Sequence, residues 1–282
     1  MKALITGAGG QLASDLEAML DGAARAYSHS DLDISDTSAV EHAISETRPD
    51  VVFNCAAFHN VDVCERESQA AWAVNALAVR ELARRSERLV HISTNYVFDG
   101  RGAEPYGEDD LPSPRSTYAI TKLTGEHLAL AYCRGSLVVR SAGLYGAHGS
   151  ASKGGNFVQR MIARAREQGS LSVVADQRLQ PTYTGDLARA ILEAVEDGVR
   201  GLIHLTASGA CSWHEFAAAI VQHAGLDVPV EPTRTIIEPG QPDRPLNGVL
   251  ARPRADSLGL TPLRPWQEAL AEYMAEAGLM AN

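Results

Sequence analysis

A glycine-rich turn close to the N-terminus constrains the fold more than any other feature. A short apolar strand at residues 2–6 leads into Gly7-Ala-Gly-Gly10-Gln-Leu-Ala13, and an amphipathic helix follows through about Leu20. This order predicts a dinucleotide-binding unit, because glycines let the backbone approach a pyrophosphate that faces the helix N-terminus. The spacing is Gly-x-x-Gly-x-x-Ala, in which Ala13 still permits close helix–strand packing. A plain glycine turn is the weaker alternative.

Further strands and helices alternate along the first half of the chain. Helices are predicted at 37–47 and about 64–86. Apolar strands are predicted at 24–28, 51–53, 89–92 and 137–140. This alternation predicts an α/β fold with a Rossmann-like, doubly wound parallel sheet.

The second half predicts a smaller lobe that is threaded in and out of the first. A glycine-rich loop at 149–155 precedes a helix at about 156–168, and a terminal helix begins at Trp266. Residues 1–146 are predicted to form an NAD(P)-binding Rossmann domain, to which 182–206 and about 246–252 return. The predicted substrate-binding lobe is discontinuous and comprises residues 147–181, 207–245 and 253–282.

Composition excludes several classes of function. The formal net charge of −10 argues against nonspecific nucleic-acid binding, which depends on clustered Lys and Arg. The four cysteines show neither metal-ligand spacing nor a disulfide pattern. We therefore predict no metal site, and we expect the protein to work in a reducing compartment. No signal-peptide pattern is present, and no apolar run approaches the roughly 18 residues that span a membrane. The protein is therefore predicted to be cytoplasmic, without a membrane partner.

Tyr118 and Lys122 form the first candidate for chemistry. A proline-rich loop ends at Ser116 and Thr117, which are suited to cap a helix that carries Tyr118-Ala-Ile-Thr-Lys122. Residues four apart share one helix face, so the phenol and the ammonium can reach the same cleft. A nearby cation is expected to lower the pKa of the phenol, as a proton donor and acceptor for a carbonyl/alcohol pair requires.

A bare Tyr-x-x-x-Lys match is weak evidence, since it also describes a half-exposed tyrosine above a solvated lysine. The glycine turn and the pair Ser93-Thr94, which ends a predicted strand, favour the functional interpretation. Asn75 lies beside an apolar helix stripe and is either a buried tie to a neighbouring loop or exposed. His91, inside an apolar strand, is predicted to be a core histidine rather than a base.

The choice between NAD and NADP is not decided by the second strand. An acid at its end would bind the ribose 2′-hydroxyl of NAD, whereas an arginine would favour NADP. Asp31 is near this place, but the run Asp31-Leu-Asp33-Ile-Ser-Asp36 equally suits a turn and helix caps, and no arginine lies between Tyr27 and Asp36.

Together these segments resemble the extended short-chain dehydrogenase/reductases and, more narrowly, the dTDP-4-dehydrorhamnose reductase family. The resemblance extends from residue 1 to the helix at Trp266. It is carried by Gly7–Leu12, Asp31–Asp36, Asn54–Phe58, Val61-Asp62, Glu65, Val74–Ala76, Ser93–Gly100, Pro105-Tyr106, Tyr118–Lys122, Gly125-Glu126, Gly155–Val158, Asp176-Gln177, Pro181-Thr182 and Arg244-Pro245. Such an ordered set is far more specific than any one motif.

The resemblance implies reduction, by NADPH and often also NADH, of the C4 ketone of a nucleotide-linked 6-deoxy-4-ketosugar. It implies that Tyr118 donates the proton, that Lys122 lowers the pKa of Tyr118 and holds the nicotinamide ribose, and that Thr94 hydrogen-bonds the carbonyl. The implied cofactor residues are Gly7, Gly10, Gln11, Leu12, Asp33, Ile34, Ala56, Ala57, Phe58, Ser93, Tyr118 and Lys122. The implied substrate residues are Thr94, Asn95, Tyr118, Asn156, Gln177, Pro181, Thr182 and Arg244.

Three positions depart from the pattern of that family. Asn95 stands where Asp is usual, Gly143 where Trp is common, and Leu179 where Gly is common. All three fall on the substrate side, so they leave the nucleotide and the sugar open. Another sugar-nucleotide reductase or epimerase is the nearest alternative, and Thr94-Asn95 lacks the acidic pair that is usual in a dehydratase.

A noncatalytic, NADP-binding regulatory subunit, like that of methionine adenosyltransferase, is the alternative from another class. The resemblance also allows a homodimer.

Overall fold

The computed structural model describes residues 1–148, 155–236 and 240–281, so most of the predicted loop at 149–155 lies outside the described residues. Six strands form one sheet in the order β10-β5-β4-β3-β1-β2, and all neighbours are parallel. The strands are β1 (Ala3–Thr6), β2 (Ala24–Tyr27), β3 (Val51–Asn54), β4 (Leu89–Thr94), β5 (Leu137–Ser141) and β10 (Gly201–His204). The prediction of an α/β fold with a parallel sheet is confirmed.

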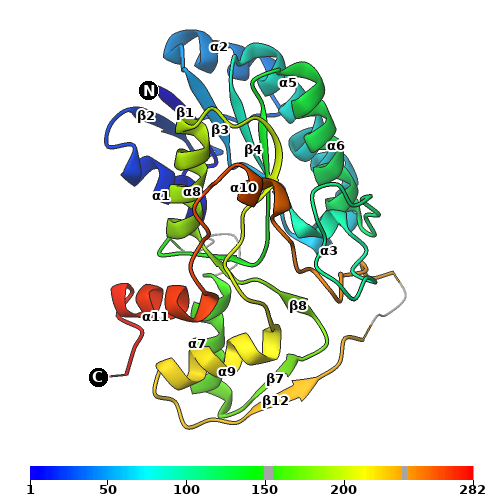
Figure 1. Ribbon diagram of the computed structural model, residues 1–282, viewed down its shortest axis with the longest axis vertical. Coiled ribbons are helices and arrows are strands. Elements are labelled where there is room, and N and C mark those ends of the chain that lie inside the picture. Colours follow the sequence, from blue (N-terminus) through cyan, green and yellow to red (C-terminus); the bar gives the residue numbers. More distant parts are fainter. Residues whose placement is uncertain (149–154, 237–239, 282) are drawn as a thin grey trace.

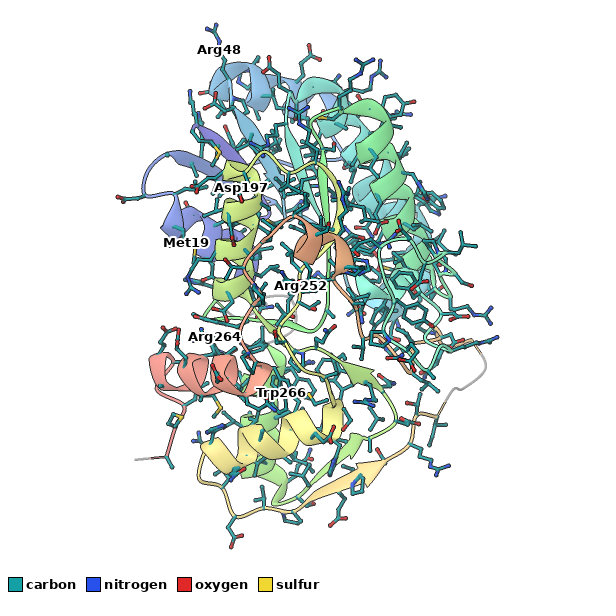
Figure 2. The ribbon with its side chains drawn as sticks, viewed as in Figure 1. Met19, Arg48, Asp197, Arg252, Arg264 and Trp266 are labelled. Atoms are coloured by element: carbon teal, nitrogen blue, oxygen red, sulfur yellow. The ribbon has the colours of Figure 1, made fainter. Side chains whose placement is uncertain are left out.

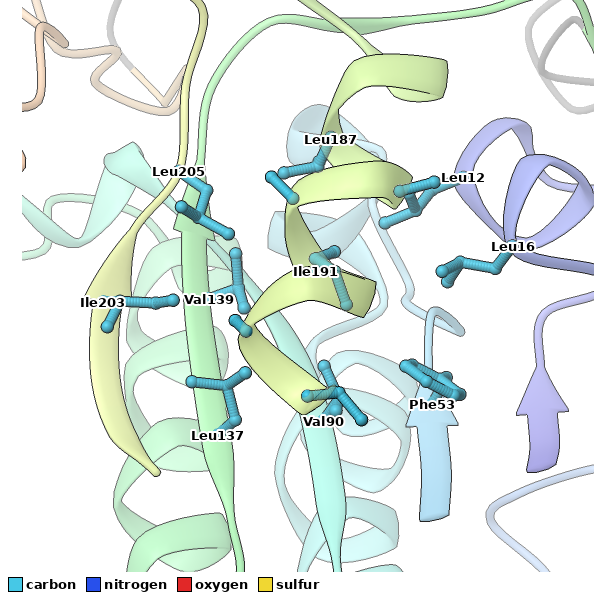
Figure 3. Close-up of a cluster of buried hydrophobic side chains, with 14 of the residues drawn as sticks. Leu12, Leu16, Phe53, Val90, Leu137, Val139, Leu187, Ile191, Ile203 and Leu205 are labelled. Atoms are coloured by element: carbon cyan, nitrogen blue, oxygen red, sulfur yellow. The ribbon is translucent and has the colours of Figure 1, made fainter. Parts of the chain in front are cut away.

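Helices cover both faces of this sheet (Figure 1). On one face lie α1 (Gln11–Met19) and α8 (Thr184–Glu196), which pack side by side. Their side chains meet those of the strands in a buried apolar cluster that includes Leu12, Val139 and Ile191 (Figure 3). On the other face lie α2 (Thr37–Thr47), α5 (Ala78–Arg85) and α6 (Thr117–Tyr132). A sheet buried on both faces explains why its strands read as continuous apolar runs.

The prediction of one continuous helix over 64–86 is wrong. The chain instead forms α3 (Val61–Arg66), α4 (Ser68–Trp72), a π-helical turn at Ala73–Leu77, and then α5. At Glu67 the backbone leaves helical geometry, with φ −116° and ψ 50°. The π-helical turn contains Asn75, whose buried side chain binds the backbone of Phe58 at both N–H and C=O. The buried alternative for Asn75 is therefore confirmed.

A second group of helices and strands forms a smaller lobe below the sheet in Figure 1. Aromatic rings dominate its core, in which Tyr145, Phe216 and Tyr273 are fully buried. Its helices are α7 (Phe157–Gln168), α9 (Trp213–His223) and α11 (Trp266–Glu276). Its strand pairs are β7 (Leu171–Val174) with β12 (Val230–Thr233), β8 (Arg178–Leu179) with β11 (Cys211–Ser212), and β6 (Leu144–Tyr145) with β9 (Thr182–Tyr183). In the described part of the chain, no helix has the length and apolar character needed to cross a membrane.

Arg264 joins the two parts of the molecule. Its guanidinium donates to Asp186 on α8 at 2.7 and 2.9 Å and also binds Glu272 on α11. Figure 2 shows Arg264 between these two helices. The short helix α10 (Pro253–Ser257) and residues through Leu263 pack in the core of the sheet. We therefore propose a domain boundary after Leu263, rather than at residue 253 as the sequence suggests.

Candidate active site

The site begins where the strand order reverses, between β1 and β3. In an open parallel sheet, ligands bind outside the carboxyl ends of the strands at such a point. Gly7 follows β1 with φ +81°, and a Cβ there would lie only 2.9 Å from the backbone nitrogen of Ala56, which follows β3. Only glycine fits this approach, so the two loops can form one close-packed floor.

The N-terminus of α1 is suited to an anionic ligand. Gly10 is its N-cap and supplies no side-chain cap, so the N–H groups of the first turn are left for a partner. The side-chain oxygen of Gln11 is buried without a hydrogen-bond partner, whereas Leu12 is packed into the sheet core. Free N–H groups and a helix dipole favour the pyrophosphate of a dinucleotide. A nicotinamide dinucleotide fits this turn, and it would supply the hydride.

The residues predicted to flank the rest of a dinucleotide lie on two neighbouring loops. Asp33 accepts hydrogen bonds from the Ser35 N–H and hydroxyl, at 2.9 and 2.7 Å, beside the buried Ile34. Asn75 fixes the backbone of Phe58 after β3, and Ala56 and Ala57 precede it half-buried. These positions agree with a cofactor path along the carboxyl edge, and their roles stay predictions.

Helix α6 brings Tyr118 and Lys122 to this edge. The Ser116 hydroxyl caps the helix by accepting from the Ala119 N–H at 3.2 Å, which confirms the predicted N-cap. The Tyr118 hydroxyl lies beside the Thr94 hydroxyl at the end of β4, and the two interact. The ring of Tyr96 meets that of Tyr118 edge-on, with centroids 5.9 Å apart. The structure therefore brings Thr94 and Tyr118 together as the sequence predicts.

The expected lowering of the Tyr118 pKa is not seen in this structure. Burial raises the pKa of Tyr118 well above 10, Tyr96 and Cys64 add to this, and the hydrogen bond from Thr94 opposes it. Lys122 does not bind the phenol but donates to the backbone oxygen of Ile92 at 2.6 Å. The phenol is consequently held protonated at neutral pH, as a proton donor must be.

Lys122 lies buried beneath the edge. Burial lowers the pKa of Lys122 to about 8, opposed by the nearby carboxylate of Glu126 and by Cys55. The ammonium still predominates at neutral pH, although by a smaller margin than for a lysine in water.

Ser93, predicted to contact the cofactor, is already engaged. Its hydroxyl donates to the carboxylate of Glu126, which also binds the Arg140 guanidinium at 2.7 and 2.9 Å. Both charged side chains are almost fully buried. Sequence reasoning missed this ion pair, although an arginine at the end of the apolar strand at 137–140 was a signal for a buried partner.

Several residues predicted to bind substrate have protein partners instead. The amide of Asn95 donates to the Gly248 carbonyl at 2.9 Å. Asn156 caps α7 and donates to the Gly146 carbonyl and the Tyr273 hydroxyl. Thr182 is fully buried and donates to the Gln180 carbonyl. A substrate contact at these positions stays a prediction that requires the present bonds to exchange.

Gln177, Pro181 and Arg244 lie on the side of the lobe. Gln177 donates to the Thr235 hydroxyl at 2.9 Å, and Pro181 is buried. Arg244 binds both carboxylate oxygens of Asp62 at 2.9 Å and hydrogen-bonds Tyr96, so it reaches the neighbour of Tyr118. Of these three, Arg244 is best placed to face a substrate.

A cavity of about 830 Å³ opens beside Arg244. Its charged lining consists of Arg101, Arg178 and Arg244 with Asp99, Glu104, Asp176 and Asp243. Arg101 and Arg178 were not singled out from the sequence, because nothing in their local pattern marks them.

Comparison with known proteins agrees with this geometry. A family profile described as RmlD substrate binding domain matches residues 1–279. The chain belongs to the RmlD substrate-binding domain family. It is thus an enzyme of the NAD(P)-dependent sugar-nucleotide 4-ketoreductase family.

Three relatives illustrate the range of this family. The spore coat polysaccharide biosynthesis protein SpsK of Bacillus subtilis (strain 168) is 39% identical over 98% of this chain and 97% of its own length. A dTDP-4-keto-6-deoxy-D-glucose reductase of Streptomyces niveus is 38% identical over 95% of each chain. The dTDP-4-dehydrorhamnose reductase of Bacillus anthracis, solved in complex with NADP, has a TM-score of 0.91 and 34% identity, with 98% of this chain and 99% of that chain covered.

Two of the departures from the RmlD family pattern touch each other. Gly143 has φ +57°, and a Cβ there would lie 2.7 Å from the Cδ1 atom of Leu179. Leu179 is itself 4% exposed, so its side chain occupies space directly over the glycine. The small residue at 143 and the large one at 179 therefore form one complementary pair rather than two independent changes.

Proposed function

We propose that this RmlD-family enzyme uses NADPH to reduce the C4 ketone of a dTDP-linked 6-deoxy-4-ketosugar. The observation that carries this proposal is that Thr94 and Tyr118 lie side by side at the carboxyl edge of the sheet, with Lys122 on the same helix as Tyr118. These residues lie on the edge at which the turn at Gly7 would hold a dinucleotide.

The proposed reaction moves one hydride and one proton. NADPH, when bound, supplies the hydride to C4. Tyr118 gives its phenolic proton to the oxygen that becomes the alcohol, and Thr94 orients the phenol and the substrate carbonyl. The raised pKa of Tyr118 suits this direction, because an acid that stays protonated at neutral pH is ready to donate. Lys122 contributes a buried positive charge close to the cofactor path.

The proposed substrate is dTDP-4-dehydro-L-rhamnose, and the product is dTDP-L-rhamnose. The Bacillus anthracis relative supports this choice by its name and NADP by its complex. The Streptomyces niveus relative supports a 6-deoxyglucose analogue instead. Gly143 and Leu179, which contact each other, depart from the family pattern on the substrate side, so both sugars belong in the test.

The test is oxidation of NADPH or NADH, followed at 340 nm, with dTDP-4-dehydro-L-rhamnose and the purified enzyme. We expect turnover that Tyr118→Phe lowers by at least a hundredfold, since general acid catalysis contributes about 10²–10⁴-fold. Cofactor affinity should stay within about twofold. Tyr132→Phe is the matched control, because Tyr132 is 49% exposed at the far end of the same helix.

The other outcomes separate the alternatives. Activity in Tyr118→Phe would remove this residue as the proton donor. Oxidation with a different dTDP-ketosugar only would keep the reductase and change its substrate. Tight NADPH binding without turnover on a panel of sugar nucleotides would favour the noncatalytic regulatory function.

A further inference from the structure

Four buried polar side chains form a continuous chain across the sheet. The Thr6 hydroxyl on β1 and the Asn54 carboxamide on β3 are hydrogen-bonded at 2.7 Å. The other end of that carboxamide lies 3.1 Å from Nδ1 of His91 on β4. Nε2 of His91 lies 3.3 Å from Nζ of Lys122 on α6. None of these four residues is more than 2% exposed.

We propose that His91, anchored by Asn54 and Thr6, is a positioning residue that holds Lys122 for cofactor binding and proton transfer. The role of Lys122 in cofactor binding and proton transfer rests on the proposed function. The contacts from Thr6 to Lys122 are features of the structure and do not depend on it. They join the residue directly before Gly7 to the lysine of the active site.

Lys122 depends on few partners. Its Nζ atom donates to the Ile92 carbonyl at 2.6 Å, and among the described residues His91 supplies the side-chain partner, with Nε2 at 3.3 Å. The ionisable groups that face it are His91 from β4, Cys55 from the loop after β3, and Glu126 on α6 itself. A buried ammonium with two acceptors is held in place by both, so the loss of either frees the end of a flexible chain.

The packing of α6 makes the contact with His91 possible. Gly125 lies where the helix crosses β4 and the π-helical turn. A Cβ at this position would lie 2.3 Å from the backbone oxygen of Asn75 and 3.1 Å from Nε2 of His91. The glycine therefore lets the helix approach closely enough for Lys122 to reach the imidazole.

A neutral imidazole suits this place. The ammonium of Lys122 can only donate, so Nε2 of His91 accepts and Nδ1 carries the proton. The Asn54 carboxamide then turns its oxygen to the Nδ1–H and donates from its nitrogen to the Thr6 hydroxyl, so that every contact has one donor and one acceptor. Burial and the charge of Lys122 hold the pKa of His91 well below its ordinary range. The histidine consequently stays uncharged and does not repel the ammonium.

The experiment compares His91→Leu with His91→Gln in the full-length protein. The first readout is the dissociation constant of NADPH, measured by fluorescence without substrate. We expect His91→Leu to weaken NADPH binding about tenfold, as the loss of a hydrogen bond to a charged group does. His91→Gln should recover part of the loss, because its carboxamide can accept from Lys122.

The second readout is the pH profile of kcat. Loss of an acceptor disfavours the ammonium, so the alkaline limb should move to lower pH in His91→Leu. His204→Leu is the matched control: His204 is fully buried and its Nδ1–H donates to the Ala251 carbonyl oxygen at 2.7 Å, but it makes no hydrogen bond to Lys122. It should lower Tm while leaving both the NADPH affinity and the alkaline limb unchanged.

Thr6→Val keeps the proposal testable if His91→Leu does not fold. This variant removes the hydroxyl that anchors Asn54 and that also accepts from the Ala56 N–H at 3.4 Å. Its readout is therefore the alkaline limb of kcat, which should move in the same direction as in His91→Leu but by less. Wild-type NADPH affinity and pH profile in a folded His91→Leu protein would overturn the inference. Absence of sugar turnover in the wild type would instead contradict the proposed function, while NADPH affinity still tests the role of His91.

Discussion

Asn95 lies next to Thr94, yet its side chain makes a hydrogen bond that stabilises the fold. Its amide donates to the Gly248 carbonyl, which ties the end of β4 to the returning segment at residues 246–252. The contact is tight, since a Cβ on Gly248 would lie 2.2 Å from the Asn95 amide nitrogen. An aspartate has no hydrogen to donate when ionised, so this tie explains why an amide stands at position 95.

We predict that Asn95→Asp lowers the free energy of unfolding by about 1–3 kcal/mol, because a buried carboxylate would face the Gly248 carbonyl without a donor. Urea denaturation monitored by circular dichroism measures the change. Asn60→Asp is the control: Asn60 is the exposed N-cap of α3, where Asp caps as well as Asn. Equal stability of the two variants would show that the tie to Gly248 contributes nothing.

At the scale of elements, α6 carries both the reacting groups and one partner of an almost fully buried ion pair. Tyr118 and Lys122 face the edge, and Glu126 one turn further binds Arg140 of β5. The Glu126 carboxylate also accepts from Ser93 on β4. The helix is thus fixed to two adjacent strands close to the residues that it presents.

Glu126→Gln should destabilise the protein by about 3–5 kcal/mol, since it leaves the buried guanidinium of Arg140 without a counter-charge. Thermal unfolding gives the measurement. The double variant Glu126→Gln/Arg140→Met should regain much of the loss, because removing both charges ends the imbalance. A single variant as stable as the wild type would mean that Arg140 finds another partner or water.

How far the sequence predicts these elements depends on the range of the contacts involved. The glycine turn, the cap at Ser116 and the spacing of Tyr118 and Lys122 are local, so the sequence predicts them. The π-helical turn within 64–86 depends on a distant contact, because its Asn75 side chain is bound to the backbone of Phe58 in another loop. The sequence of the helix alone does not predict it. The partners of Asn95 and Ser93 are equally distant along the chain, and no local pattern reveals them.

At the scale of the whole molecule, two buried histidines link stability to pH. Burial lowers the pKa of His204 to about 4, and Arg140 adds to this effect. The pKa of His91 is also lowered. In the unfolded chain both regain ordinary values near 6.5, so the unfolded state binds more protons between these two values. Stability is therefore complete above about pH 6.5 and falls as the pH decreases towards 4.

The His204 contribution to the free energy of unfolding should fall by about 3 kcal/mol across this interval, because its pKa differs between about 6.5 unfolded and about 4 folded, at about 1.36 kcal/mol per pH unit. Urea denaturation at a series of pH values between 4.5 and 7 measures the slope. His204→Gln should flatten the slope, whereas His42→Gln should not, because the His42 side chain is 81% exposed. An unchanged slope in His204→Gln would assign the pH dependence to other groups.

The position of β10 has a consequence for biosynthesis. This strand completes the sheet beside β5, but it comes only at residues 201–204, after the whole of α7 and α8. A nascent chain that ends before it exposes the open edge of β5, and an unpaired edge strand is a template for aggregation. Because pairs so distant along the chain also raise the contact order and slow folding, we expect the growing polypeptide to need chaperone protection on the ribosome until about two hundred residues have emerged.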